Sequence, residues 1–207
     1  LRCCNTPPGL DIQVNTLKVS ADDYARALAR SDIAHTLCDF PSGCITLHGG
    51  SVTALPGFEE GLFYVQDRAA RMAVEIAAPT PGMRVLDACS APGGKAFSAA
   101  VRMENRGSIL ACDIHEKKLA LIRQGAERLG IDIITTEARD ARRGDAALEG
   151  AFDVVIADVP CSGIGVIRKK PEIRCKSEDE IAGLPAIQRD ILANLSRFVK
   201  PGGTLLY

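Results

Sequence analysis

Residues 85–95 read Val-Leu-Asp-Ala-Cys-Ser-Ala-Pro-Gly-Gly-Lys, and this stretch decides the fold of the chain. Residues 84–87 are a short apolar run closed by an acid, and residues 91–94 cannot continue a strand and must turn. Lys95 then opens a helix-compatible run over 96–101. A strand, a glycine turn and a helix in this order build a pocket of the nucleotide-binding type, because glycines let the backbone approach a ligand and a helix N-terminus offers N–H donors.

Two familiar phosphate-binding motifs are excluded at this turn. A P-loop needs an earlier glycine and a hydroxyl after the lysine, but Cys89 and Ala96 occupy those positions. The dinucleotide fingerprint Gly-x-Gly-x-x-Gly is also absent. An ordinary strand-to-helix turn is the plainer alternative, and acids at the ends of neighbouring strands favour the pocket instead.

Length and charge limit the class of protein. The chain has 207 residues, which suggests one large domain or one and a half, and its net charge of −1 argues against binding nucleic acid by bulk charge alone. No apolar run approaches the roughly 18 residues of a membrane span, and no signal peptide is visible. We expect a cytoplasmic monomer without membrane contact. Because Leu1 is not Met and Tyr207 lies just inside a strand-like run, we also expect a piece of a longer protein.

The eight cysteines are scattered without a Cys-x-x-Cys pair, which favours a reducing compartment over a disulfide scaffold. One cluster, His35, Cys38, Cys44 and His48, contains zinc-type ligands. Its central gap is too short for a zinc finger, and its second half alternates like a strand. We therefore predict no metal site and treat the cysteines as small buried hydrophobes.

Residues 1–61 predict a small α+β module. Its expected elements are a strand at 10–16, a helix at 21–30 that begins after Ser20, and strands near 33–37 and 44–47.

Residues 62–207 predict a second domain of the α/β class. Strands are expected at 62–65, 83–88, 108–113, 131–136, 152–158 and 204–207. Helices are expected at 66–78, 94–104, 115–129, 141–149 and 178–199. Pro185 is the expected breaking point of the last helix, and residues 201–203 end it. Strands that alternate with helices indicate a doubly wound, Rossmann-like parallel sheet with helices on both faces. Ligands of such a sheet bind at the carboxyl ends of the strands.

Four strands of this domain carry an acid at or near their carboxyl end: Asp87, Asp113, Asp140 and Asp158. An acid after the second strand is suited to grip ribose hydroxyls, because a carboxylate can accept a hydrogen bond from both. Acids are common near strand ends, but several along one sheet edge are harder to attribute to chance. We therefore predict a ribose-binding role for Asp113.

Residues 158–163 read Asp-Val-Pro-Cys-Ser-Gly and form the second informative stretch. Pro160 stops the strand, so Asp158 and Cys161 are expected to face the same crevice as the glycine turn. A thiol and a carboxylate beside a nucleotide pocket suggest covalent or acid-assisted chemistry on an electrophilic ring. The alternative for Cys161 is a buried small hydrophobe.

A basic loop follows this turn. It contains Arg168, Lys169, Lys170, Arg174 and Lys176, with only Glu172 opposing them. The loop is either a solvated surface or a phosphate track that positions a polynucleotide, which Arg139, Arg142 and Arg143 would extend. No aromatic residue is interleaved, so base stacking by this loop is not supported.

The chain resembles the RNA (cytosine-5)-methyltransferases. The resemblance rests on residues 85–95, 112–113, 140–142, 158–163 and 200–207, and upstream on 14–18, 55–58 and 65–69. The upstream stretches look like the bacterial Fmu/Sun type, which modifies 16S ribosomal RNA. The resemblance covers nearly the whole chain.

This resemblance implies S-adenosyl-L-methionine as the cofactor, ribosomal RNA as the partner, and a role for each motif. The cofactor would be wrapped by the turn formed by Cys89, Ser90, Ala91, Pro92, Gly93, Gly94 and Lys95. Asp113 would take the ribose, Asp140 would lie near the adenine, and Asp158 would lie where cofactor and target base meet. Cys161 would serve product release.

The resemblance also implies an RNA-recognition-like first module and a nucleophilic cysteine in a Thr-Cys motif just beyond Tyr207. This sequence departs from the family pattern at Ser90 and Ala96, where Ala and Thr are usual, and at Arg139, where Gly commonly precedes the adenine-side acid.

Two rival functions remain open at the level of sequence. A methyltransferase acting on an exocyclic amine needs no thiol and usually carries an aromatic residue where Cys161 stands. A cofactor-binding RNA scaffold without catalysis is the other alternative. The residues that follow Tyr207 would separate it from an enzyme.

Overall fold

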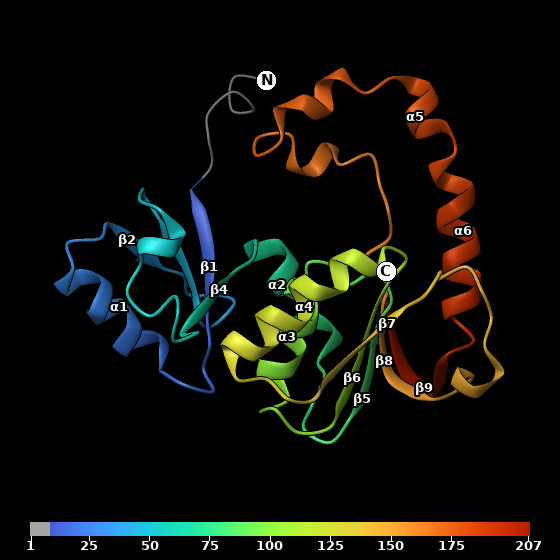
Figure 1. Ribbon diagram of the computed structural model, residues 1–207, viewed down its shortest axis with the longest axis horizontal. Coiled ribbons are helices and arrows are strands. Elements are labelled where there is room, and N and C mark those ends of the chain that lie inside the picture. The colour runs from blue at the N-terminus through green and yellow to red at the C-terminus, as the bar shows by residue number, and fades with distance from the viewer. Residues whose placement is uncertain (1–8) are drawn as a thin grey trace.

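Two β-sheets organise the computed structural model, which describes residues 9–207 (Figure 1). Residues 1–8, the start of the predicted first module, lie outside the described part. Among the described residues, no helix is long and apolar enough to cross a membrane.

The first sheet has four antiparallel strands in the order β2–β3–β1–β4. Their bounds are β1 (Leu10–Val14), β2 (His35–Leu37), β3 (Cys44–Leu47) and β4 (Phe63–Val65). Helix α1 (Ala21–Arg30) begins after Ser20, whose side chain accepts a hydrogen bond from the backbone N–H of Asp23. Tyr24 and Leu28 of α1 are buried against the sheet. The predicted helix at 21–30 is confirmed.

The end of the first sheet differs from the predicted boundary at residue 61. Strand β4, which the sequence analysis assigns to the second domain, pairs antiparallel with β1 through Ile12–Val65 and Val14–Phe63. Because this pairing spans about fifty residues of sequence, no local pattern indicates it. The first sheet therefore extends to Val65.

The second sheet has five parallel strands in the order β7–β6–β5–β8–β9. The strands are β5 (Arg84–Asp87), β6 (Ser108–Asp113), β7 (Ile134–Ala138), β8 (Phe152–Ile156) and β9 (Val199–Leu206). The helices are α2 (Arg68–Ala77), α3 (Gly94–Arg102), α4 (Glu116–Leu129), α5 (Glu178–Ala182) and α6 (Leu184–Leu195). Helices α2, α3 and α4 contribute to one core cluster and α6 to another. Figure 1 shows α6 on the opposite side of the sheet from α2–α4. The predicted α/β class and doubly wound sheet are confirmed.

The order of the strands locates the ligand crevice. The chain runs from β5 outward through β6 to β7 and then returns to place β8 on the other side of β5. The carboxyl ends of β5, β6 and β8 therefore surround the point where the strand order reverses, which is where open α/β sheets bind ligands.

The last third of the second domain differs in detail from the predicted elements. Helix α6 ends at Leu195, and β9 runs through Pro201, Gly202 and Gly203, where the sequence predicts a turn. A register shift between Phe152 and Val154 of β8 accommodates these residues within the strand pair. Such irregularities let a sheet accept proline and glycine. The predicted helix at 141–149 is reduced to a short 3₁₀ turn at Ala146–Leu148.

A buried amide joins the first module to the second domain. Asn15 is fully buried, and its Nδ2 donates to the carbonyl of Gly61 at 2.9 Å and to that of Leu129, the last residue of α4, at 2.8 Å. Lys18 Nζ donates to the neighbouring carbonyl of Arg128 at 3.0 Å. The side chains of Asn15 and Lys18 thus take up carbonyls at the C-terminus of α4 that the helix itself leaves unpaired.

Arg128 of α4 also contacts the first module at this junction. Its guanidinium donates to the carbonyls of Phe58 and Phe63 and lies 4.4 Å from the ring centroid of Phe58. A side chain at Gly61 would bring its Cβ within 2.0 Å of the carbonyl oxygen of Arg128, so only glycine fits there. The two sheets are consequently held together by directional contacts at one end of α4.

Candidate functional site

The turn between β5 and α3 has a fixed shape. The N–H of Ser90 donates to the carbonyl of Cys112 in the next strand, and the N–H of Gly93 donates to the carbonyl of Ser90, both at 2.7 Å. Gly93 has a φ of +111°, and a Cβ built there would lie 2.6 Å from Cζ of Phe97. The predicted strand, turn and helix are confirmed, and the glycine is required both by its backbone conformation and by the close approach of Phe97.

The main cleft lies at the carboxyl ends of β5, β6 and β8 and has a volume of about 460 Å³. Among its lining residues are Cys89, Ala91, Asp113, Asp140 and Asp158, which the sequence analysis selects for the cofactor, and Arg139 and Arg142, which it selects for a phosphate track. Ile187 and Ile191 of α6 form an apolar wall that the sequence analysis does not identify. The cleft thus combines an apolar wall with several carboxylates, which suits a ligand that has both an apolar ring and hydroxyl or amino groups.

Asp113 ends β6 and is 8% exposed within the cleft. Its Oδ1 accepts a hydrogen bond from the N–H of His115 at 2.9 Å, which fixes the carboxylate in place. The position is the one predicted for a ribose-binding acid.

Asp140 is tied to its neighbour Arg142. The Arg142 side chain donates to it through Nε at 2.9 Å and through a terminal nitrogen at 2.7 Å, and the backbone N–H of Arg142 also donates to it at 3.0 Å. The hydrogen bonds from Arg142 lower the pKa of Asp140 to about 2. Arg139 is paired separately with Glu137 at 2.6 Å and Asp145 at 3.0 Å. Arg139 and Arg142, two of the three arginines predicted to extend a phosphate track, are thus engaged with carboxylates at close range.

Lys95 and Asp158 form an ion pair across the crevice, with 2.5 Å between Nζ and Oδ2. Lys95 comes from the first turn of α3, and Asp158 follows β8. Asp158 also lines two smaller cavities beside the main cleft, one of about 200 Å³ and one of about 180 Å³ that reaches Tyr207. Asp158 therefore lines all three cavities, and Lys95 lines the two smaller ones.

Asp87 is the acid whose environment differs most from expectation. It is fully buried, and although no hydrogen bond of good geometry from the described residues reaches its carboxylate oxygens, the Ser90 hydroxyl, the Ala96 N–H and the Lys95 cation all lie close enough to lower its pKa. Burial raises the pKa of this carboxyl to about 7. The hydroxyl of Ser90 is also buried, and it faces this carboxyl. Asp87 is therefore a buried part of the turn after β5 rather than an acid open to the cleft.

The cysteines of the site differ in exposure. Burial, reinforced by the surrounding carboxylates, raises the pKa of the Cys89 thiol to about 12, which disfavours a reactive thiolate there. Cys161 is exposed and is absent from the residues that line the cavities beside Asp158. Its loop is held by Gln188 Nε2, which donates to the carbonyl of Pro160 at 2.8 Å.

The predicted basic loop folds back toward the start of α2. Lys169 pairs with Asp67, and Lys176 Nζ donates to the carbonyl of Ser162 at 2.9 Å. Arg168 and Arg174 are exposed on the same loop. The loop therefore borders the crevice, while part of its positive charge is matched within the chain.

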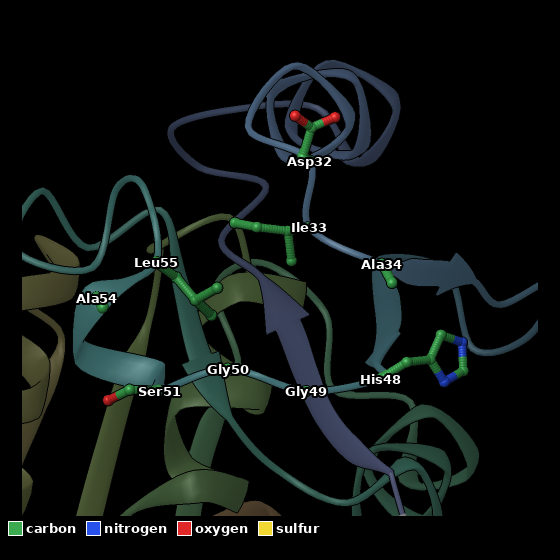
Figure 2. Close-up of a pocket in the computed structure, with 9 residues that line it drawn as sticks. All are labelled: Asp32, Ile33, Ala34, His48, Gly49, Gly50, Ser51, Ala54 and Leu55. Carbon is green, nitrogen blue, oxygen red and sulfur yellow. The ribbon is translucent and has the colours of Figure 1, made fainter.

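A separate cavity of about 270 Å³ lies in the first module (Figure 2). Its polar side chains, from Asp32, His48 and Ser51, point away from one another (Figure 2). The His48 ring is hydrogen-bonded to the hydroxyl of Thr36 at 2.8 Å. No group of three or more metal-ligating side chains occurs among residues 9–207. This cavity assembles no reactive constellation, in contrast to the cleft of the second sheet.

Comparison with protein families and curated proteins finds one matching family model and several similar proteins. Residues 74–207 match the model of the family described as 16S rRNA methyltransferase RsmB/F. The chain is 36% identical over 97% of its length to "Probable ribosomal RNA small subunit methyltransferase B" of Bacillus subtilis, and 35% identical over 98% to the protein named ribosomal RNA small subunit methyltransferase B in Pseudomonas syringae. It spans about half the length of these relatives, 45% and 46% respectively.

Solved structures agree with the fold. The crystal structure of PH0851 superposes with a TM-score of 0.93 at 31% identity, and covers 99% of this chain and 47% of its own. A methyltransferase homolog protein from Pyrococcus horikoshii gives a TM-score of 0.85 at 29% identity, with 99% of this chain and 65% of its own covered. NSun6 from Pyrococcus horikoshii, solved with SFG, gives 0.87 at 17% identity over 99% of this chain and 76% of its own, a likeness of fold alone.

Proposed function

The chain belongs to the 16S rRNA methyltransferase RsmB/F family, and from that premise we propose that it binds S-adenosyl-L-methionine and serves methyl transfer to C5 of a cytosine in ribosomal RNA, 16S RNA in particular. The observation that carries this proposal is the Lys95–Asp158 ion pair. It stands between a cleft sized for the cofactor and a loop that carries an exposed thiol and several cations.

The residues of the main cleft fit the cofactor. Asp113 offers a buried, oriented carboxylate for ribose hydroxyls, and Ile187 and Ile191 offer an apolar wall for a flat ring. Asp140 would serve the adenine side while it remains bound to Arg142. The turn at residues 89–95 lines both cavities, so the remaining part of the cofactor would lie against it.

When bound, the cofactor supplies a methyl group activated on a sulfonium. Cytosine C5 is a poor nucleophile until a thiolate adds at C6 of the ring. Thiolate addition puts negative charge on the ring, so a carboxyl at the polar edge of the base must be protonated and give its proton to that edge as the bond forms; we assign this role to Asp158. Lys95 holds the Asp158 side chain in position before the base arrives. The target must leave its stack to reach the site, so a single-stranded or flipped cytosine is expected.

The cofactor proposal is tested by calorimetry on this chain. Asp113→Asn keeps the shape of the side chain but removes its charge, and should weaken S-adenosylmethionine binding by about 1–3 kcal/mol, the scale of hydrogen bonds to a charged group. Asp132→Asn, an exposed acid outside the cleft, is the matched control and should leave binding unchanged. Preference of the unaltered chain for NAD over S-adenosylmethionine would contradict the proposal.

We further propose that Cys161 serves product release and that the nucleophile is the Thr-Cys cysteine that the family resemblance implies after Tyr207. The position of Tyr207 in a cavity shared with Asp158 supports this division. In a chain extended through that motif, Cys161→Ser should still form the covalent RNA adduct and retain it, visible as a slow-migrating band under denaturing conditions. Loss of the adduct, or methyl transfer by residues 1–207 alone, would return the nucleophile's role to Cys161.

The basic loop is proposed to contact RNA phosphates. Arg168, Lys169, Lys170 and Arg174 lie on a loop that borders the crevice, where phosphate contacts would set the register of an RNA strand. Lys170→Glu should weaken RNA binding and flatten its salt dependence, because fewer counterions are released. Lys117→Glu on the exposed face of α4 carries the same charge change and should have little effect. If RNA binding by the two variants depended equally on salt concentration, the proposal would fail and the loop would be a solvated surface.

A further inference from the structure

The first module exposes an aromatic ring in the loop between β2 and β3. Phe40 of this loop is 51% exposed. The other aromatic residues of the described part of the module pack against its core or against the second domain: Tyr24, Phe58, Phe63 and Tyr64. The loop neighbours Asp39 and Ser42 are exposed and polar. An exposed ring with polar neighbours suits a single flat ligand better than a broad protein interface.

Arg68, the first residue of α2, fixes the loop that carries Phe40. Its Nε donates to the carbonyl of Phe40 at 2.8 Å. Its backbone N–H donates to Oδ2 of Asp11 in β1 at 3.2 Å, and Asp11 Oδ1 accepts from the hydroxyl of Thr46 in β3 at 2.7 Å. Arg68 is therefore anchored to the first module through both its backbone and its side chain, and Phe40 is held beside the start of α2.

Asp67, the residue before Arg68, connects the same place to the basic loop and to the crevice. It pairs with Lys169 of the basic loop. It also lines the cavity of about 200 Å³ that Asp158 lines. Two consecutive residues thus contact two different loops, since Asp67 binds the basic loop and Arg68 binds the loop of Phe40. The two loops consequently lie along the same border of the crevice.

Arg68 keeps its positive charge available at this border. It is exposed, and its Nε is bound by an uncharged carbonyl, whereas Arg139 and Arg142 are matched by carboxylates. The terminal nitrogens of a guanidinium form a fork that suits phosphate oxygens. Asp39, the exposed acid next to Phe40, disfavours a phosphate at the ring itself. The border therefore offers a cation for a phosphate and, beside it, a ring for an uncharged base.

We propose that Phe40 and Arg68 bind a nucleotide that flanks the target cytosine, with its base stacked on the Phe40 ring and a phosphate accepting from Arg68. This inference rests on the proposed function, because it names a contact for the RNA substrate. Stacking on an aromatic ring adds affinity with little dependence on base sequence. Residues 159–176, which include the basic loop, contain no aromatic residue. The first module thus supplies the stacking that the basic loop lacks.

Fluorescence tests the stacking directly, because the chain contains no tryptophan. Phe40→Trp introduces a single indole, whose emission should be quenched when a single-stranded oligocytidylate is added, since a stacked base quenches the excited ring. An abasic oligomer of the same length should leave the emission unchanged. Leu121→Trp, at a 52% exposed position of α4, is the matched control and should respond to neither oligomer.

Affinity measurements separate the two contacts. Phe40→Ala should weaken oligocytidylate binding by about 5- to 100-fold and leave its salt dependence unchanged, because a stacked base releases no counterion. Arg68→Gln should flatten the salt dependence, because a phosphate contact is lost. Phe40→Trp should bind at least as tightly as the unaltered chain, and Leu121→Ala should bind equally well.

The other outcomes overturn the inference in distinguishable ways. Unquenched Phe40→Trp and an unchanged affinity of Phe40→Ala, in a chain that binds RNA, would refute the inference and leave the proposed function standing. Loss of S-adenosylmethionine binding as well as RNA binding in Phe40→Ala would assign the ring a structural role. Emission of Phe40→Trp that shifts with protein concentration without RNA would assign the ring to a contact between two copies of the chain. Failure of the unaltered chain to bind RNA would refute the proposed RNA substrate, and the inference with it.

Discussion

The contact of Asn15 with the C-terminus of α4 is the constraint on which the site depends. One buried amide satisfies carbonyls from both halves of the chain, at Gly61 and Leu129. Such a group is costly to leave unpaired, so the two sheets have one favourable relative placement rather than many. Strand β4 then delivers Gln66 to the turn after β5 as part of the same rigid arrangement. The first module is consequently a wall of the crevice as well as a neighbour of it.

Four acids lie at the crevice, and they differ in their ionic partners and in their burial. Asp140 is matched by Arg142, and Asp158 by Lys95. Asp113 is held by a backbone N–H. Only Asp87 is fully buried, with a pKa raised to about 7 by that burial, so it bears the largest desolvation cost. Burial therefore keeps Asp87 partly uncharged near neutral pH, while the ionised carboxylates of the crevice are those with a cation or a backbone N–H beside them.

The parts of the site that are local in sequence can be predicted from sequence. The turn at residues 89–95 and the acid at Asp113 follow from glycines, strand patterns and spacing, because these features act over a few residues. Strand β4 and the course of β9 are set by distant partners, so local patterns misplace the sheet boundary and the strand start. Gln66 is missed for the same reason, since its partners Gln13 and Ser98 lie far away in sequence. Asp87 did offer a signal, an acid inside an apolar strand, that could have indicated its burial. The exposure of Cys161 depends on how its long loop folds, which no short motif encodes.

The central claim is that both modules bind one small ligand across their junction. The most direct measurement is a crystal structure of this chain with S-adenosylhomocysteine. The account predicts ribose hydroxyls within hydrogen-bond distance of Asp113 and ligand contacts from residues 65–70 as well as from the turn at residues 89–95. A ligand whose contacts are confined to the second sheet and the turn after β5 would contradict it.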